Sequence, residues 1–204
     1  MRITVIGCGR WGSFLAWYAD RLGHQVSLYG RASSAHMRAF RETRTNGLVS
    51  LPDSIMLTGE IPENTEVVLI SIDSQGLRAL LTQQAAALHH KTLVLCMKGL
   101  EIGTGKRLTQ IVTEILGEQQ PVAVWIGPGH VQEFTRGVPN CMVIDSHDEA
   151  LKTDLIEALS GDLVRFYYGR DLIGNEIGAA AKNVVGIAAG ALDGVGLGTL
   201  KGAL

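Results

Sequence analysis

Short apolar runs alternate along this chain with longer stretches in which apolar side chains recur every three or four residues. Short runs rich in Val, Ile and Leu are typical of strands, and the longer spacing is typical of helices. The most continuous run, residues 66–72 (E-V-V-L-I-S-I), indicates a central parallel strand that is covered on both faces. This alternation predicts an α/β fold with a doubly wound, mostly parallel sheet. The expected strands cover residues 3–6, 25–29, 66–72, 92–97, 122–126, 140–145 and 164–168, and the expected helices cover residues 14–23, 74–88, 104–116 and 171–193.

Three glycines follow the first expected strand at the spacing G-x-G-x-x-G. Gly7 permits a tight turn, Gly9 lets a pyrophosphate approach the backbone, and Gly12 lets the next helix pack close to the strand. The start of that helix offers N–H groups and the positive end of a dipole to phosphates. Because strand, glycine turn and helix occur in this order, we expect a dinucleotide site in a Rossmann-like fold rather than a purely structural turn.

The end of the second expected strand bears on which dinucleotide is bound. NAD-selective sites often have an acidic residue there, which binds the ribose 2′-hydroxyl. This chain has Gly30 and Arg31 instead, followed by Ser33 and Ser34. A guanidinium can donate two parallel hydrogen bonds to a 2′-phosphate, so the sequence favours NADP(H), with NAD(H) as the alternative cofactor. The other interpretation of Arg31 is an ordinary solvated arginine.

Two lysines are candidates for chemistry. Ligands in such folds bind beyond the carboxyl ends of the strands, where Lys98, residues 71–75 and residues 127–130 should lie. The ammonium of Lys98 could bind an anionic or carbonyl oxygen, or be a solvated loop lysine. Lys182 and Asn183 form the polar centre of a small-residue, apolar stretch. Burial would lower the pKa of Lys182 toward values useful for proton transfer, and the alternative is a structural lysine whose ammonium reaches water.

Composition and charge narrow the class of protein. Of the 204 residues, 46% are hydrophobic and 19% are charged, which allows a large core and argues against disorder. The net charge of −2 gives no reason to expect nucleic acid or an anionic membrane as a partner. Cys8, Cys96 and Cys141 lack metal-ligand spacing, so we expect no metal site and three reduced, buried thiols of a cytosolic protein. We expect neither a signal peptide nor a membrane span.

Five segments of the chain together resemble the NAD(P)-dependent sn-glycerol-3-phosphate dehydrogenases. They occur in the order found in that family and cover nearly the whole chain. The last segment is the most specific, because few other families have a lysine–asparagine pair in a Gly/Ala-rich helix. The segments are V-I-G-C-G-R-W-G (5–12), L-Y-G-R (28–31), K-G-L-E (98–101), G-P-G-H-V-Q-E-F-T-R-G-V-P (127–139) and N-E-I-G-A-A-A-K-N-V-V-G-I-A-A-G-A-L-D-G-V-G (175–196).

The resemblance implies reversible hydride transfer between a nicotinamide and dihydroxyacetone phosphate, which gives sn-glycerol 3-phosphate for glycerophospholipid synthesis in the cytoplasm. Lys182 would be the catalytic residue that donates a proton to the carbonyl oxygen. The substrate would be bound by Lys98, Gly127, Gly129 and Asn183. The cofactor would contact Gly7, Gly9, Arg10, Trp11, Gly12, Arg31, Lys98 and Val131.

The resemblance also implies a division of the chain. Residues 1–170 would form the NAD(P)-binding Rossmann domain, and residues 171–204 would begin an all-α substrate-binding domain. Because the family continues beyond the position of Leu204 with further substrate-binding residues, we expect a truncated piece that binds dinucleotide but turns over poorly, and a homodimer for the full-length enzyme. The chain has Gly129 where the family commonly has Ser or Thr, and Val131 where it commonly has Ala.

Two other functions fit part of the sequence. A non-catalytic module that senses or scaffolds a dinucleotide would share the glycine motif, but it gives no reason for Lys182 and Asn183 in an apolar helix. A related dehydrogenase of the 3-hydroxyacid or ketopantoate type would also place a lysine on the helix between domains. The K-G-L-E segment and the spacing of Gly127, Pro128 and Glu133 favour the glycerol phosphate enzyme.

Overall fold

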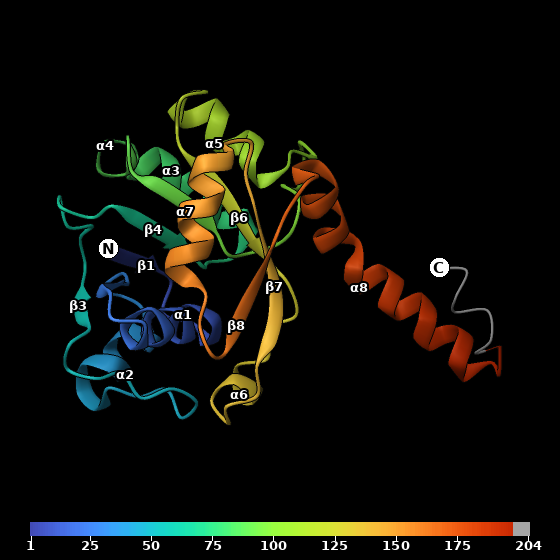
Figure 1. Cartoon of the computed structure of the whole chain (residues 1–204), viewed down its shortest axis with the longest axis horizontal. Coiled ribbons are helices and arrows are strands. Elements are labelled where there is room, and N and C mark those ends of the chain that lie inside the picture. The colour runs from blue at the N-terminus through green and yellow to red at the C-terminus, as the bar shows by residue number, and fades with distance from the viewer. Residues whose placement is uncertain (198–204) are drawn as a thin grey trace.

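Eight strands form one sheet in the computed structural model, which describes residues 1–197 (Figure 1). Their order is β3-β2-β1-β4-β5-β6-β7-β8, the first six being parallel. β7 is antiparallel to β6, and β8 is parallel to β7. This topology confirms the expected Rossmann-like, doubly wound, mostly parallel sheet. The strands are β1 (Arg2–Ile6), β2 (Gln25–Tyr29), β3 (Met56–Thr58), β4 (Val67–Ile70), β5 (Thr92–Leu95), β6 (Val122–Ile126), β7 (Asn140–Asp145) and β8 (Val164–Tyr168).

Helices cover both faces of the sheet and form two separate cores. One core contains Phe14, Met37 and Leu155, so α1, α2 and α7 lie on the same face. The other contains Leu77 and Leu108, so α3 and α5 lie on the opposite face. The helices are α1 (Arg10–Arg21), α2 (Ala35–Thr43), α3 (Leu77–Gln83), α4 (Ala85–Leu88), α5 (Leu108–Leu116), α6 (Val131–Phe134), α7 (Glu149–Leu159) and α8 (Leu172–Gly194), with a 3₁₀ turn, η1 (Ser74–Gly76), before α3.

Some helix boundaries differ from the sequence prediction. The expected helix at 74–88 is divided into η1, α3 and α4, and the break falls at Gln84, whose backbone is not helical. The expected helix at 104–116 begins only at Leu108, because the preceding residues form a folded loop. α7 was not predicted, although Leu151, Leu155 and Leu159 recur at helical spacing.

One of the three cysteines contradicts the expectation of buried thiols. Cys8 and Cys96 are buried, whereas Cys141 is exposed. Cys141 lies on β7 opposite Arg165 of β8, and both side chains are exposed, while the neighbouring Met142 is buried. Successive side chains of a strand point to opposite faces, and no helix covers the outer face here within residues 1–197.

The last helix, α8, extends away from the sheet (Figure 1). Of its 23 residues, only Leu172 and Glu176 are buried. Lys182 and Asn183 are exposed, which corrects the expectation of a buried lysine: the apolar residues around it belong to a helix that is largely uncovered within residues 1–197. A division of domains at residue 170 stays a prediction, and the final residues of the expected second domain, 198–204, lie outside the described residues. Within residues 1–197, no helix is long and apolar enough to cross a membrane.

Candidate active site

A cleft of about 770 Å³ lies at the carboxyl ends of the parallel strands. Loops that follow β1, β4, β5 and β6 line it, and α8 closes one side. This is the edge at which the strand order reverses between β1 and β4, where open α/β sheets bind ligands. The predicted site residues that line this cleft are Gly9, Arg10, Trp11, Lys98, Gly127, Gly129 and Lys182.

A second hollow, of about 510 Å³, continues from the cleft toward β2. Both spaces are lined by Gly9 and by residues 71–73, so they adjoin each other, and we call the two together the trough. The second hollow is also lined by Gly7, Arg31, Ser34 and His36. The trough therefore runs from Arg31, past the glycine turn, to Lys98 and Lys182. Lys182 and Arg31 are 151 positions apart in the sequence, and they line the cleft and the second hollow, respectively.

The glycine turn is packed so closely that two of its positions exclude a side chain. Gly7 has φ of +113°, and a Cβ there would lie 2.1 Å from the carbonyl oxygen of Ser71. A Cβ on Gly12 would lie 1.8 Å from the carbonyl oxygen of Gly7. By contrast, a Cβ on Gly9 would meet no atom within 4 Å. The three positions therefore have the geometry that the motif predicts: a tight turn, an open approach and a close helix–strand contact.

The amino terminus of α1 faces the cleft. Its N-cap is Gly9, which has no side chain to bind the first-turn N–H groups, and the first turn contains no acidic residue. Unpaired N–H groups and the positive helix dipole make such an end a binding place for phosphate. Next to it, the hydroxyl of Ser34 accepts a hydrogen bond from Met37 N at 3.3 Å and lies 3.3 Å from Cys8 Sγ. Ser34 is thereby held beside the hollow that Arg31 lines.

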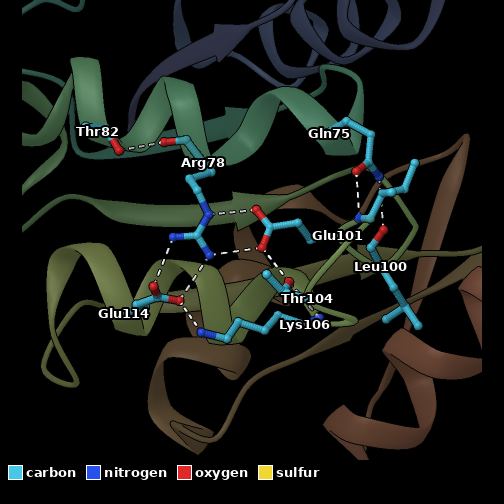
Figure 2. Close-up of polar contacts among 9 residues, drawn as sticks. Gln75, Arg78, Thr82, Leu100, Glu101, Thr104, Lys106 and Glu114 are labelled. Carbon is cyan, nitrogen blue, oxygen red and sulfur yellow. Dashed lines mark hydrogen bonds and ion pairs between the residues drawn. The ribbon is translucent and has the colours of Figure 1, made fainter.

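The loop that carries Lys98 is held from α3 and the turn before it (Figure 2). We call residues 98–107 the Lys98 loop. The side-chain amide of Gln75 donates to Leu100 O at 3.0 Å and accepts from Ile102 N at 2.9 Å. Arg78 donates two hydrogen bonds to the Glu101 carboxylate, with distances of 2.7 Å from Nε and 3.0 Å from one terminal nitrogen. Thus the glutamate of the K-G-L-E segment is paired with an arginine.

Charge pairing in this cluster keeps its carboxylates ionised. Arg78 also bridges to Glu114 of α5, which accepts a further bond from Lys106 at 2.6 Å. The Arg78 guanidinium, with help from the Thr104 hydroxyl, lowers the pKa of Glu101 to about 2. Hydrogen bonds from Arg78 and then Lys106 lower the pKa of Glu114 to about 2. The same contacts raise the pKa of Arg78, so all these groups are charged at neutral pH.

Two polar side chains attach the start of α8 to the sheet, to α5 and to the Lys98 loop. Glu176 accepts hydrogen bonds from the Thr109 backbone N–H at 3.0 Å, from the Thr109 hydroxyl at 2.6 Å and from Arg107 at 2.5 Å. Asn175 donates to the buried Asp145 carboxylate at 2.6 Å. After Glu176, α8 passes the cleft, and Lys182 is one of the residues that line the cleft. Glu176, which lies too far around the helix to pair with Lys182, has its partners on α5 and the Lys98 loop.

Three predicted site residues line neither the cleft nor the second hollow. Gly12 is buried beneath the glycine turn, and Val131 is buried at the start of α6. Asn183 is exposed on α8 and is not among the residues that line either hollow. Gly129 does line the cleft, and a Cβ there would lie 2.8 Å from the Trp11 ring. This close contact with Trp11 leaves no room for a Ser or Thr side chain without movement of the ring.

Several residues of the site were missed by sequence reasoning. His36 lines the hollow beside Arg31, and Trp125 and Met142 line the cleft, with Trp125 Nε1 3.0 Å from Met142 Sδ. On sequence, Trp125 and Met142 are ordinary members of apolar strands, so no motif marks them. Gln75 and Arg78 lie outside every motif, although residues 71–75 were expected at this edge.

Comparisons with known proteins agree with this geometry. Residues 2–152 match the model of a family described as NAD-dependent glycerol-3-phosphate dehydrogenase N-terminus. The glycerol-3-phosphate dehydrogenase [NAD(P)+] of Chelativorans sp. is 36% identical over 96% of this chain and 62% of its own length. The corresponding enzyme of Mesorhizobium japonicum is 39% identical over 97% of this chain and 59% of its own length. The chain thus spans about 60% of the length of these curated relatives.

A solved structure shows the same fold. The crystal structure of glycerol-3-phosphate dehydrogenase from Coxiella burnetii superposes with a TM-score of 0.87 at 28% sequence identity, covering 99% of this chain and 64% of that chain. The residues matched by the family model include the glycine turn, Arg31 and the Lys98 loop. With its fold, its trough and these matches taken together, the chain belongs to the NAD-dependent glycerol-3-phosphate dehydrogenase family.

Proposed function

We propose that this chain binds NADP(H) along the trough and uses Lys182 to reduce dihydroxyacetone phosphate reversibly to sn-glycerol 3-phosphate. The observation that carries the proposal is the trough, in which a hollow lined by Arg31 and the glycine turn adjoins a cleft lined by the two lysines at positions 98 and 182. The curated relatives are named glycerol-3-phosphate dehydrogenase [NAD(P)+], which supports the same reaction for the longer protein.

The glycine turn fits the pyrophosphate of a dinucleotide. The space above Gly9 is open, and the first-turn N–H groups of α1 point into it from a helix end without a capping side chain. With the pyrophosphate bound there, one half of the dinucleotide would extend toward Arg31. The other half would extend toward Lys98 and Lys182. The adenosine would occupy the smaller hollow, and the nicotinamide would occupy the larger cleft. When bound, the nicotinamide supplies the hydride for reduction and accepts it in the reverse reaction.

Arg31 supports a preference for NADP(H). Its exposed guanidinium lines the smaller hollow together with Ser34 and His36, which offer a hydroxyl and an imidazole N–H at the same place. A phosphate on the ribose would accept bonds from these groups, whereas a free 2′-hydroxyl would use few of them.

The preference can be measured by titrating the chain with NADPH and NADH. Arg31→Ala should raise the Kd for NADPH about tenfold or more, since a hydrogen bond to a charged group contributes about 1.5–3 kcal/mol, and should leave the Kd for NADH nearly unchanged. Arg41→Ala, at an exposed arginine of α2, is the matched control. Equal losses for both dinucleotides in Arg31→Ala would contradict the 2′-phosphate role.

The two lysines suit a substrate that carries both a phosphate and a carbonyl group. Lys98 and Lys182 place positive charge in the same cleft, beside the backbone of Gly127 and Gly129. In this proposal, the Lys182 ammonium donates a proton to the carbonyl oxygen as hydride reaches the carbon, and Lys98 orients the substrate. Asn183 is left out of the contact set because its side chain does not line the cleft.

The reaction is tested by NAD(P)H oxidation with dihydroxyacetone phosphate. A single-turnover assay, with the chain in excess over the dinucleotide, detects even a slow reaction. Lys182→Ala should lower the rate by ~10²–10⁴, the usual effect of losing an acid–base group, without changing the Kd for NADPH. Lys182→Arg keeps the charge but donates a proton poorly, so it separates proton transfer from charge. A mild effect of both variants would remove Lys182 from this role.

A related substrate is the second candidate. Faster oxidation of NADPH with a 3-oxo acid or with ketopantoate than with dihydroxyacetone phosphate would favour the alternative dehydrogenases. For the longer enzyme, we further propose a homodimer and a cytoplasmic location, which rest on the family resemblance alone. Sedimentation of the longer protein, and fractionation of cells that produce it, would test these two statements.

A further inference from the structure

The Lys98 loop is folded upon itself, so that its two ends are fixed to each other. Leu100 and Arg107 form an antiparallel bridge, and Glu101 N donates to Lys106 O at 2.9 Å. Gly105 N also donates to Glu101 O at 2.9 Å. Because these bonds close the loop, a displacement near Lys98 must be accompanied by a displacement near Arg107.

One end of the loop is bound to α3. Arg78 contacts the Glu101 carboxylate through two hydrogen bonds, a geometry that fixes orientation as well as distance (Figure 2). The Glu101 side chain is only 11% exposed, although the loop lies at the surface. Glu101 follows Lys98 by three residues, so this contact sets the backbone from which Lys98 extends.

The other end of the loop is bound to α8. Arg107 pairs with Glu176 at 2.5 Å, and their side chains are 15% and 4% exposed. A carboxylate that is buried to this degree is costly unless it is paired, and here three donors pair it. Glu176 is also one of only two buried residues of α8. The direction in which α8 leaves the sheet, and with it the position of Lys182, therefore depends on this contact.

We propose that Arg78 and Glu176 are positioning residues that fix Lys98 and Lys182 relative to each other through the folded Lys98 loop. The inference rests on the proposed function, in which both lysines act on one substrate. Neither residue lines the cleft, so each acts through another group. A misplacement of about 1 Å in a reacting group can lower a rate ~10²-fold, which gives such positioning its importance.

Spin-label distance measurements on the chain test this proposal directly. Cys141→Ser removes the exposed thiol, while Cys8 and Cys96 are buried. Labels are then placed at three exposed positions: Ile102 on the loop, Ile187 on α8 and Asp154 on α7. These positions give loop-to-body, helix-to-body and loop-to-helix distance distributions. NADPH binding, measured on every variant, shows whether the fold is retained.

Each substitution has a distinct expected result. Glu176→Gln should broaden the helix-to-body distribution about twofold, as expected for local opening of an end held by few contacts. Arg78→Met should broaden the loop-to-body distribution and also the helix-to-body distribution, because the loop joins the two. In the Glu176→Gln background, Arg78→Met should have no further effect on the helix. Glu157→Gln and Arg165→Met, at exposed positions of α7 and β8, are the matched controls.

Either of two results overturns the proposal. One is an unchanged helix-to-body distribution in Arg78→Met. The other is equal broadening of that distribution by Arg78→Met in the parent chain and in the Glu176→Gln background. Should Arg78→Met fail to bind NADPH, Glu101→Gln cuts the same contact from the loop side and decides the question. In the single-turnover assay, both substitutions should lower the rate about tenfold without changing the Kd for NADPH. Absence of any turnover by the parent chain would count against the proposed function, while the distances would still decide the positioning.

Discussion

The two sides of the cleft are built in different ways. The dinucleotide side, made of β1, the glycine turn and α1, is defined by close packing: Gly7 and Gly12 leave no space for a methyl group, and Phe14 and Leu15 behind them are fully buried. The lysine side, made of the Lys98 loop and α8, is defined by contacts between charged groups. Most of its residues are exposed.

The two sides of the site should therefore respond differently to pH and salt. Packing depends on atomic radii and is nearly independent of pH and salt, so the dinucleotide side should be the same under most conditions. Attraction between charges weakens with salt, less so for a buried pair such as Arg107 and Glu176, and it is lost when the carboxylates are protonated. The glycine turn is therefore fixed more firmly than the two lysines on the other side of the cleft.

The largest expected effect tests the packing of the dinucleotide side. Gly12→Ala places a methyl group 1.8 Å from the Gly7 carbonyl oxygen, so one of the two backbone segments must move. We expect a loss of about 3 kcal/mol in the free energy of unfolding, at the upper end of the usual cost of overpacking. Urea denaturation measures this loss, together with NADPH binding.

Gly9→Ala is the matched control for that substitution. Its methyl group would meet no atom within 4 Å, and φ of Gly9 is −74°, which alanine adopts freely. The free energy of unfolding should change by about 1 kcal/mol or less, while NADPH binding weakens because the methyl group occupies the approach of the pyrophosphate. Equal stability losses in both variants would show that the glycine turn is less closely packed than its geometry indicates.

An intermediate effect tests the charged contacts of the lysine side. In the folded chain, the pKa values of Glu101 and Glu114 are about 2, below the ordinary glutamate value of about 4.3. A carboxyl whose pKa is lower in the folded state stabilises the fold above its unfolded pKa, and this contribution is lost as the pH falls through the folded value. Arg78 should thus stabilise the chain at about pH 7 and contribute much less at about pH 2.

The measurement compares the parent with Arg78→Met by urea denaturation across this pH range. The difference in unfolding free energy should be greatest above about pH 4.3 and should shrink steadily below it. High salt at neutral pH should also reduce it. Arg165→Met, at an exposed arginine of β8, serves as control and should show no such pH dependence. A difference that stays constant with pH would mean that Arg78 stabilises the chain by packing alone.

The smallest expected effect concerns the outer part of α8. Ile187 is 73% exposed, so Ile187→Ser should change the unfolding free energy of this chain by no more than about 0.5 kcal/mol. NADPH affinity should be unchanged. A destabilisation that increases with protein concentration would contradict this expectation and would show that a second copy covers the helix.

The same contrast explains which parts of the site could be predicted from the sequence. The dinucleotide side is local: a strand, three glycines and a helix lie within the first 21 residues, and their spacing is sufficient to predict this Rossmann-like strand, turn and helix. The trough also places Arg31, Lys98 and Lys182 along one path, as the motifs suggested.

The lysine side could not be predicted in this way. Arg78 and Glu101 are 23 positions apart, and Arg107 and Glu176 are 69 positions apart, so no periodicity marks either pair. The prediction that a helix begins at residue 104 was wrong, because the apolar pattern contains no information about the hydrogen bonds that close the Lys98 loop. Lys182 was expected to be buried because its neighbours are apolar, yet composition alone does not tell whether a helix is covered.

The reversed direction of β7 and β8 has a consequence for tolerated changes in chain length. These strands end at the edge of the sheet opposite the cleft, so α8 begins there and must return along β6 before Lys182 reaches the cleft. The number of helical residues between Glu176 and Lys182 therefore determines where Lys182 lies relative to the cleft. One inserted residue would rotate the lysine by about 100° and advance it by about 1.5 Å. Insertions should be tolerated in the loop before α8 or beyond Gly186, but not between Glu176 and Lys182.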